Sequence, residues 1–424
     1  MSTKNNDAWN DLFQENKTLA TIEKHGFAHV SADLMRKYRE PRLMAKIDTI
    51  EVLPKIFSEN DLSILPIKNG EYVIFKDPDF HSYFKFPKSI DNIKPRNYRP
   101  YKPLSDFDSF SNLEYMNEAR ALDIALMSSI IKDFTEEQSI WLTIRGRQYT
   151  SGFQVLLPSL RKTLQISSVQ IEIDAGYETD QAIYIFEAKI GTRGNFNIRQ
   201  LLFPYLEWKN RTNKKVIPIF FYFTNDLYYM FQFELGNSLD ASHIIKQACY
   251  KFEDPNTINL QRIFSNKTLI ENIERDIPFP QANDLNKVID TVTLINQGYT
   301  SKQELADILE FDERQGDYYA NAARFLGLLD RENNNYYITD TGKAFLKLSS
   351  SIKRAEFVAE QLAVRPVFHQ VFHQLLLNDL SIDSLESINL EVIVEENTEL
   401  CGSTPHRRAS TVKQWIRWIF NYVS

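Results

Sequence analysis

The chain has 424 residues, of which 43% are hydrophobic and 25% are charged, and its formal net charge is −7. This composition is that of an ordinary globular protein, and the length predicts about two to four domains. The negative charge excludes a basic coat that binds nucleic acid over the whole surface, so any DNA-binding surface must be local.

Targeting and redox signals are few. No apolar run reaches the ~20 residues of a membrane helix, and Met1–Asp7 lacks a signal-peptide core. Cys249 and Cys401 are too few for a disulfide framework or a cysteine zinc site. We therefore expect a cytoplasmic protein of bacterial or archaeal type, with no membrane partner.

Residues 1–105 are expected to form an N-terminal α/β region, with a role in DNA contact left open. Apolar residues at helical spacing predict a helix over Asp7–His25. Apolar runs on both sides of Asn69–Gly70 predict a hairpin, because Asn-Gly is a favoured two-residue turn.

A basic stretch, Lys94–Lys102, ends this region, and its prolines argue against regular structure. Arg96 and Arg99, with Tyr98 and Tyr101 for stacking, suit an arm that follows a DNA backbone. A solvated linker is the alternative interpretation.

Residues 106–280 are expected to alternate helices and strands. A helical apolar stripe predicts a helix over Ser111–Asp133. The later elements are predicted as strands at Ser139–Arg145, Gly152–Leu157, Leu164–Asp174 and Ile183–Lys189, a helix from about Phe196, and strands at Val216–Thr224 and Leu227–Glu234.

Charged residues end two of these strands. Side chains two apart share one face of a strand, so Glu187 and Lys189 point the same way. Asp174 ends the preceding strand, and Ala175–Ala182 between them is polar, contains a glycine and predicts a turn. Charges at the end of such an apolar strand are costly to bury unless they are paired or metal-bound. Two carboxylates and a lysine here can hold Mg²⁺ and activate a water, with a surface salt bridge as the plainer alternative.

This arrangement resembles the PD-(D/E)xK nucleases, in which an Asp after one strand precedes Glu-x-Lys on the next. Asp174, Glu187 and Lys189 match that pattern, while Ile173 replaces the usual proline. The segment Phe196–Tyr205 is similar to the one that follows the catalytic lysine in some type II restriction endonucleases. The predicted order of elements also agrees with the αβββαβ core of this fold.

The resemblance implies a mixed α/β (α+β) nuclease with Mg²⁺ as its cofactor. Asp174, Glu187 and the Ala188 carbonyl would bind the metal, and Lys189 would orient or deprotonate a water. Glu172 is a candidate for a second metal, with an ordinary surface acid as the alternative.

Gln200 is a further candidate near the scissile phosphate. Pro204 removes a helical N–H four residues later, so the helix should kink beside Gln200. The alternative is a helix residue held by local hydrogen bonds. Arg193 and Arg199 are candidate phosphate contacts, with a surface role equally open.

Residues 285–350 are expected to form a winged helix. Ser301–Glu304 has the form of a capping box and should begin its second helix, and 330–339 predicts a hairpin wing. In a DNA-reading winged helix the third helix enters the major groove, while other winged helices bind proteins. The candidate contacts on that helix are Arg314, Gln315, Tyr318, Tyr319, Asn321 and Arg324.

Residues 351–424 are expected to form a second, helix-turn-helix-like module. His369 and His373 are four apart but lack a third ligand, so we interpret them as structural. The last helix, Ser403–Ile419, resembles a C-terminal recognition helix of some restriction endonucleases. Its candidate DNA contacts are Arg407, Arg408, Ser410, Thr411, Lys413, Gln414 and Arg417.

We therefore expect a type II restriction endonuclease that cuts double-stranded DNA, beside a companion DNA methyltransferase that the resemblance implies. A homodimer is left open, because palindromic cutting requires one and offset cutting does not. The alternatives are a structure-specific repair or recombination nuclease and a non-catalytic DNA-binding regulator with a vestigial nuclease core.

Overall fold

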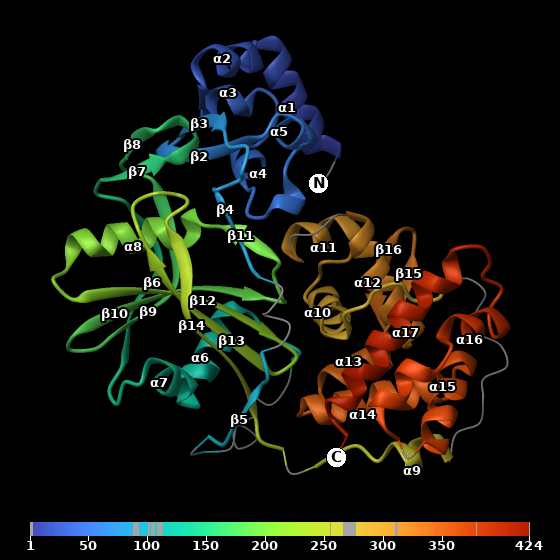
Figure 1. Ribbon diagram of the computed structural model, residues 1–424. Coiled ribbons are helices and arrows are strands. Elements are labelled where there is room, and N and C mark those ends of the chain that lie inside the picture. The colour runs from blue at the N-terminus through green and yellow to red at the C-terminus, as the bar shows by residue number, and fades with distance from the viewer. Residues whose placement is uncertain are drawn as a thin grey trace.

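The computed structural model describes residues 3–87, 93–100, 102, 107, 113–254, 256–265, 277–309, 313–378 and 380–423. The protein has the predicted mixed α/β class, with 43% helix and 27% strand. An N-terminal unit lies above a central sheet, and a helical C-terminal half lies beside that sheet (Figure 1). Within the described ranges, no helix is both long and apolar enough to cross a membrane.

The N-terminal unit packs helices around a three-stranded sheet with the order β1-β3-β2. The predicted hairpin is confirmed, and Gly70 in its turn has a φ of 75°, which favours glycine. The predicted helix over Asp7–His25 is instead two helices, because Lys17 between them is left-handed with a φ of 50°. The elements are α1 (Thr3–Glu15), α2 (Thr18–His25), β1 (Phe27–Ser31), α3 (Ala32–Arg36), α4 (Pro41–Ala45), η1 (Ile50–Val52), α5 (Lys55–Ser58), β2 (Leu62–Lys68) and β3 (Glu71–Lys76).

The central sheet has seven strands in the order β5-β14-β13-β12-β10-β9-β6. Strand β10 is antiparallel to β9 and parallel to β12, so the connection through α8 is a crossover. The elements are β5 (Arg96–Tyr98), α6 (Glu118–Met127), α7 (Ile130–Thr135), β6 (Trp141–Tyr149), β9 (Gln170–Glu178), β10 (Ala182–Ile190), α8 (Arg199–Arg211), β12 (Lys215–Thr224), β13 (Leu227–Leu235) and β14 (Ser242–Phe252). Two short pairs flank it, β4 (Tyr83–Lys85) with β11 (Asn195–Asn197), and β7 (Phe153–Leu157) with β8 (Lys162–Ile166) across η4 (Pro158–Leu160).

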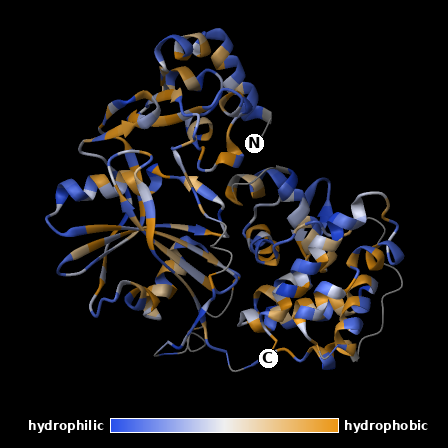
Figure 2. Ribbon diagram, viewed as in Figure 1, coloured by the Kyte–Doolittle hydropathy of each residue, from blue (hydrophilic) through white to orange (hydrophobic). Residues whose placement is uncertain are grey.

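Helices cover both faces of this sheet, α8 on one and α6 with α7 on the other (Figure 1). Side chains of β10 alternate between the two cores: Ile183 and Ile185 pack on the α8 side, and Tyr184 and Phe186 on the α6 side. Figure 2 shows hydrophobic colour along the strands and hydrophilic colour on the outer helices of the N-terminal unit. The prediction that β10 is a buried central strand is therefore confirmed.

Several predicted boundaries were wrong. The helix predicted over Ser111–Asp133, whose first two residues lie outside the described ranges, is two shorter helices: Asn117 caps α6, and left-handed Ser129 separates it from α7. The strand predicted over Leu164–Asp174 is divided between β8 and β9. Strand β9 also continues through Glu178, so most of the predicted turn is strand and the chain reverses at 179–181.

The basic stretch was also predicted wrongly as irregular. Arg96–Tyr98 forms β5, an edge strand that pairs in parallel with the end of β14. The prolines lie outside the paired residues, at Pro95 and Pro100, where they remove no hydrogen bond from the ladder. Tyr101 lies outside the described residues.

The elements predicted for the winged helix are present. The capping box is confirmed, since Ser301 Oγ accepts from the Glu304 N–H (3.2 Å) and Glu304 Oε2 accepts from the Ser301 N–H (3.0 Å). The predicted wing is the hairpin of β15 and β16. The elements of this half are α9 (Leu260–Ser265), α10 (Leu285–Asn296), α11 (Lys302–Leu309), α12 (Glu313–Phe325), β15 (Leu329–Glu332), β16 (Asn335–Ile338), α13 (Asp340–Leu346), α14 (Ser351–Ala363), α15 (Pro366–Leu377), η5 (Ile382–Ser387), α16 (Leu390–Glu396) and α17 (Thr404–Phe420).

The C-terminal half is joined to the sheet by one continuous hydrophobic core and by buried polar contacts. Arg354 of α14 is 1% exposed and forms an ion pair with Asp226 in the β12–β13 turn. Its guanidinium also donates to Asn225 Oδ1 (2.8 Å) and to the Leu348 carbonyl (2.7 Å). A buried cation with this many acceptors fixes the two parts against each other.

Candidate active site

Asp174 lies in β9 at a β-bulge, where Arg145 of β6 alone opposes both Asp174 and Ala175. The bulge turns the carboxylate toward β10, and Asp174 Oδ2 accepts from the Ala188 N–H at 2.7 Å. Arg145 Nε donates to the Asp174 carbonyl (3.1 Å), so the backbone of the bulge is also paired. The predicted approach of Asp174 to the end of β10 is therefore observed.

Glu187 lies on β10 and is 7% exposed. Its Oε1 is 2.5 Å from Lys189 Nζ, two residues later on the same face of the strand. Gln200, in the first turn of α8, donates from Nε2 to the same oxygen at 2.9 Å. Three of the four residues predicted as catalytic thus meet at one carboxylate oxygen, and Asp174 lies beside them.

Burial controls the charge of this cluster. It raises the pKa of Glu187 to about 8, against the opposing effect of Lys189, and the charge of Asp174 raises that pKa further. Burial also raises the pKa of Asp174, while Lys189 and the Ala188 N–H act to lower it. The site therefore favours an additional positive charge beside its carboxylates.

Gln200 has a second polar atom in the site. Its Oε1 is buried and accepts no hydrogen bond from any residue of the described ranges. A buried acceptor without a donor is costly, so a bound water at this position would stabilise it.

Two acids of the site were missed by the sequence analysis. Glu118, the first residue of α6, raises the pKa of Asp174 through its charge. Glu118 was missed because the helix was predicted to begin at Ser111, before the Asn117 cap, so the sequence did not indicate that Glu118 begins a helix. Asp48, from the N-terminal unit, likewise raises the pKa of Glu187, and nothing in its local sequence indicated this.

The donor set suits a hard divalent cation, although it is sparse. No three His, Cys, Asp or Glu side chains of the described residues converge closely enough to form a metal cluster by themselves. Two carboxylates, from Asp174 and Glu187, lie together, and Mg²⁺ commonly uses one or two carboxylates and completes its shell with waters and phosphate oxygens. The unfilled Gln200 Oε1 is consistent with such a water. These residues therefore fit Mg²⁺.

Glu172, the candidate for a second metal, faces outward instead. It lies 3.4 Å from Arg147 of β6, and both side chains are more than half exposed. This geometry matches the alternative interpretation, an ordinary surface acid.

The candidate DNA contacts of the winged helix divide into two groups. Arg314 and Gln315 are exposed, and Tyr318 is partly exposed. Asn321 and Arg324 are both 8% exposed, and Arg324 donates to Asn321 Oδ1 at 3.2 Å. The burial of these two does not support a direct contact with DNA, because they lie on the inner face of α12.

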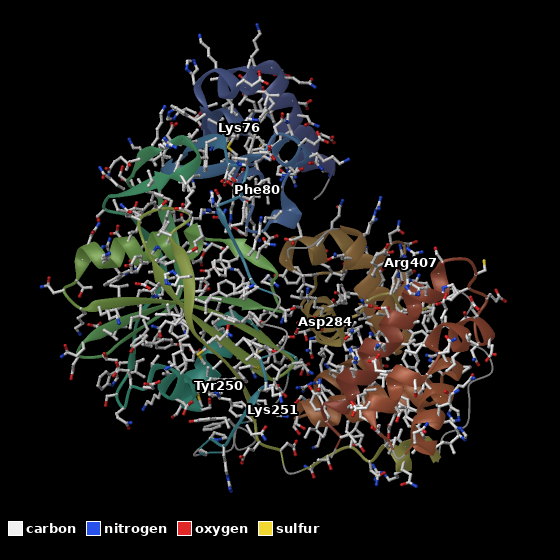
Figure 3. The ribbon with its side chains drawn as sticks, in the orientation of Figure 1. Lys76, Phe80, Tyr250, Lys251, Asp284 and Arg407 are labelled. Carbon is white, nitrogen blue, oxygen red and sulfur yellow. The ribbon has the colours of Figure 1, made fainter. Side chains whose placement is uncertain are left out.

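Several basic side chains of helix α17 are bound to other residues of the protein. Lys413 lies 2.6 Å and Arg417 2.5 Å from Glu386 of η5, and Arg408 donates to Gln281 at 2.6 Å. Arg407 and Ser410 are exposed. Figure 3 shows Arg407 at the upper part of the C-terminal half, farther from the sheet than Asp284. Gln414 and Arg417, farther along the helix, are exposed as well, whereas Thr411 is buried, so the exposed part of the predicted reading surface runs along α17 from Arg407 to Arg417.

Arg96 and Arg99 are exposed but lie away from β10, the strand that carries Glu187 and Lys189. Strand β5 is four positions from β10 in the sheet, which is about 19 Å at ~4.8 Å per strand. Arg96 lies over the Tyr250 ring (Figure 3 labels this tyrosine), and Arg99 lines a cavity of about 840 Å³ between β14 and α14. These two arginines are thus not part of the candidate active site.

Three domain families of unknown function match the chain: DUF6996 over residues 6–74, DUF6997 over 78–258 and DUF7226 over 287–424. No curated protein and no solved structure matches. The cluster of Asp174, Glu187, Lys189 and Gln200 lies in the middle match, Asp48 lies in the first, and one match spans both predicted C-terminal modules.

Proposed function

We propose that the protein is a Mg²⁺-dependent endonuclease of the type II restriction class that hydrolyses phosphodiester bonds in double-stranded DNA. One observation carries the proposal: Lys189 and Gln200 both contact Glu187 Oε1, and Asp174 is hydrogen-bonded to the intervening Ala188 N–H. Residues matched by sequence pattern alone thus form one connected site, which is what a working catalytic centre requires.

The topology around the site supports the same proposal. Helix α6 precedes three neighbouring antiparallel strands, β6, β9 and β10, and α8 then crosses over to the parallel strand β12. This is the αβββαβ order that the sequence resemblance implies. The β7–β8 hairpin is an insertion between the first two strands.

The chemistry follows from the charges of the site. A divalent cation held by Asp174, Glu187 and the Ala188 carbonyl would lower the pKa of a bound water and neutralise phosphate charge. Lys189 would hold its ammonium at the position where negative charge develops during attack and orient the water, or, as the neutral amine, would accept a proton from that water. Gln200 fixes Glu187 through Nε2 and leaves Oε1 to accept from that water.

A structure-specific DNA repair or recombination nuclease is the second candidate. The burial of Asn321 and Arg324, with the pairing of Lys413 and Arg417 to Glu386, leaves fewer side chains that can read bases. Phosphate and shape contacts depend less on such side chains. A regulator with a vestigial core is disfavoured, because its site would have no reason to keep Asp174, Glu187 and Lys189 together.

Digestion of unmethylated phage DNA with Mg²⁺ or with EDTA tests the proposal. We expect discrete Mg²⁺-dependent fragments from the wild type, and a loss of about 10²- to 10⁴-fold in Lys189→Ala without loss of DNA binding. Glu172→Gln, on the exposed face of β9, is the matched control and should cut normally. A smear would favour the structure-specific alternative, and full activity of Lys189→Ala would remove the catalytic role of that lysine.

A further inference from the structure

A short segment of the N-terminal unit, residues 47–51, reaches the candidate active site. This segment contacts β11 and the start of α8, which lie between the catalytic strand β10 and Gln200. The contacts join residues about 145 positions apart in the chain. They therefore belong to the tertiary fold and not to the local course of the chain.

Asn197 is the centre of the contact. It is 1% exposed, its backbone N–H donates to the Asp48 carbonyl at 2.6 Å, and its side-chain amide donates to the Ile47 carbonyl at 3.1 Å. Its own Oδ1 accepts from the Arg199 N–H at 3.2 Å, in the first turn of α8. One buried side chain thus connects the N-terminal unit to the helix end that presents Gln200.

Asn195 forms a second connection. Its Oδ1 accepts from the Ile50 N–H, and its Nδ2 donates to both carboxylate oxygens of Glu51, each at 2.8 Å. On the other side of β11, the pairing with β4 and the bond from the Ile198 N–H to the Ser82 carbonyl (2.9 Å) hold the segment from behind. The backbone before Gln200 is thus held on both sides.

Asp48 adds a charge to this joint. Its Oδ1 lies 3.3 Å from Arg199 Nη2, and both side chains are largely buried. Arg199 directly precedes Gln200 and is a cation at the start of the helix that faces Glu187. One guanidinium nitrogen is used by Asp48, and a guanidinium has further N–H groups that can donate to a phosphate.

We infer that the N-terminal unit completes the catalytic centre, with Asp48 as the positioning residue that holds Arg199 beside Gln200 so that its guanidinium meets the DNA phosphate. The inference rests on the proposed nuclease function and adds a residue to it. Asp48 does not touch the reacting atoms. It acts through Arg199, because a flexible arginine is pre-organised only when a fixed carboxylate holds it.

The test is single-turnover cleavage of unmethylated DNA by the full chain with saturating enzyme, together with the Kd for DNA measured in Ca²⁺. Asp48→Asn keeps the shape of the side chain and removes its charge. We expect the cleavage rate to fall about 10- to 100-fold while the Kd changes less than about threefold, as loss of a charge-assisted hydrogen bond predicts. A contact that only supports the fold would not lower the cleavage rate while leaving the Kd for DNA nearly unchanged.

Arg199→Gln breaks the same pair from the other side and keeps the test valid if Asp48→Asn does not fold. The double variant should lose no more than the larger single loss, because both changes remove one interaction. Asp33→Asn is the matched control: it breaks an aspartate–arginine pair of the same unit, with Arg36 at 2.5 Å, but its side chain is 91% exposed.

The cleavage measurements distinguish failure of the inference from failure of the proposed function. A wild type that cuts, with Asp48→Asn equally fast or with additive losses in the double variant, overturns the inference and leaves the proposed function standing. A wild type that cuts no DNA with Mg²⁺ overturns the proposed function, and the inference with it.

Discussion

Gln200 and Glu187 are joined by a 2.9 Å hydrogen bond that connects helix α8 to strand β10. The acceptor, Glu187 Oε1, also lies 2.5 Å from the Lys189 ammonium. This bond makes the start of α8 part of the site and decides which oxygen of Glu187 stays available for a cation.

Gln200→Ala should slow DNA cleavage more than it changes DNA affinity. A hydrogen bond to a charged group contributes about 1.5–3 kcal/mol, so we expect a loss of about 10- to 100-fold in the cleavage rate at saturating Mg²⁺. Lys209→Ala, in the exposed last turn of the same helix, is the control. An unchanged rate in Gln200→Ala would make the Gln200 bond purely structural.

Mg²⁺ should stabilise the wild-type fold. The carboxylates of Asp174 and Glu187 lie together in a buried site that favours added positive charge, so a cation that binds only the folded state raises its stability. At a concentration of about 100 times Kd the gain is about 2.7 kcal/mol, visible as a higher melting temperature in Mg²⁺ than in EDTA. Asp174→Asn should reduce this difference, whereas Glu172→Gln should keep it. Equal melting temperatures for the wild type in millimolar Mg²⁺ and in EDTA would contradict metal binding here.

Asp290 predicts a pH dependence of stability. Burial raises its pKa to about 8 from 3.8, while Thr224, which donates to Asp290 Oδ2 at 2.8 Å, and the charges of Arg193 and Lys287 act to lower it and Asp284 raises it. The folded state keeps the proton to a higher pH than the unfolded chain, so the free energy of unfolding should fall as pH rises from about 4 to about 8.

Asp290→Asn removes this titration and keeps the hydrogen-bonding shape. Chemical denaturation at pH 6 and pH 8.5 should therefore show a smaller difference between the two pH values in the variant than in the wild type. The exposed Asp33→Asn variant should leave the difference unchanged. An identical pH difference in Asp290→Asn and the wild type would show that Asp290 ionises normally in the folded protein.

Arg354→Leu should loosen the C-terminal half from the sheet. The change leaves Asp226 without its partner and removes the bonds to Asn225 and to the Leu348 carbonyl. Breaking a buried pair on one side costs about 3–5 kcal/mol, so we expect a markedly lower denaturation midpoint. The double variant Arg354→Leu/Asp226→Leu should recover part of the loss, since no unpaired charge then remains. Wild-type stability of Arg354→Leu would show that the hydrophobic core alone joins the two parts.

Local patterns in the sequence predicted much of this architecture. Alternation along β10, the Asn69–Gly70 turn and the Ser301–Glu304 capping box depend on neighbouring residues, and all three were confirmed. The approach of Asp174 to Ala188 also followed from short-range reasoning, because the two strands are adjacent in the chain.

Features that depend on distant residues were missed. Gly176 suggested a turn, but it lies inside β9, where a Cβ would come within 2.6 Å of the Ile144 Cβ. Only the packing of β6 explains that glycine. The contacts of Asp48 with Asn197 and Arg199 likewise have no local signal, since the partners are about 150 residues apart.

The bulge at Asp174 changes the face of the sheet to which the odd-numbered side chains of β9 point. Before it, Ile171 and Ile173 belong to the core on the α8 side of the sheet. After it, Ala175 and Tyr177, which without the bulge would continue the same alternation, belong to the core on the α6 side. A regular strand of the same residues would turn Ala175 and Tyr177 to the α8 side of the sheet, so the bulge at Asp174 is what keeps each half of β9 facing its own core.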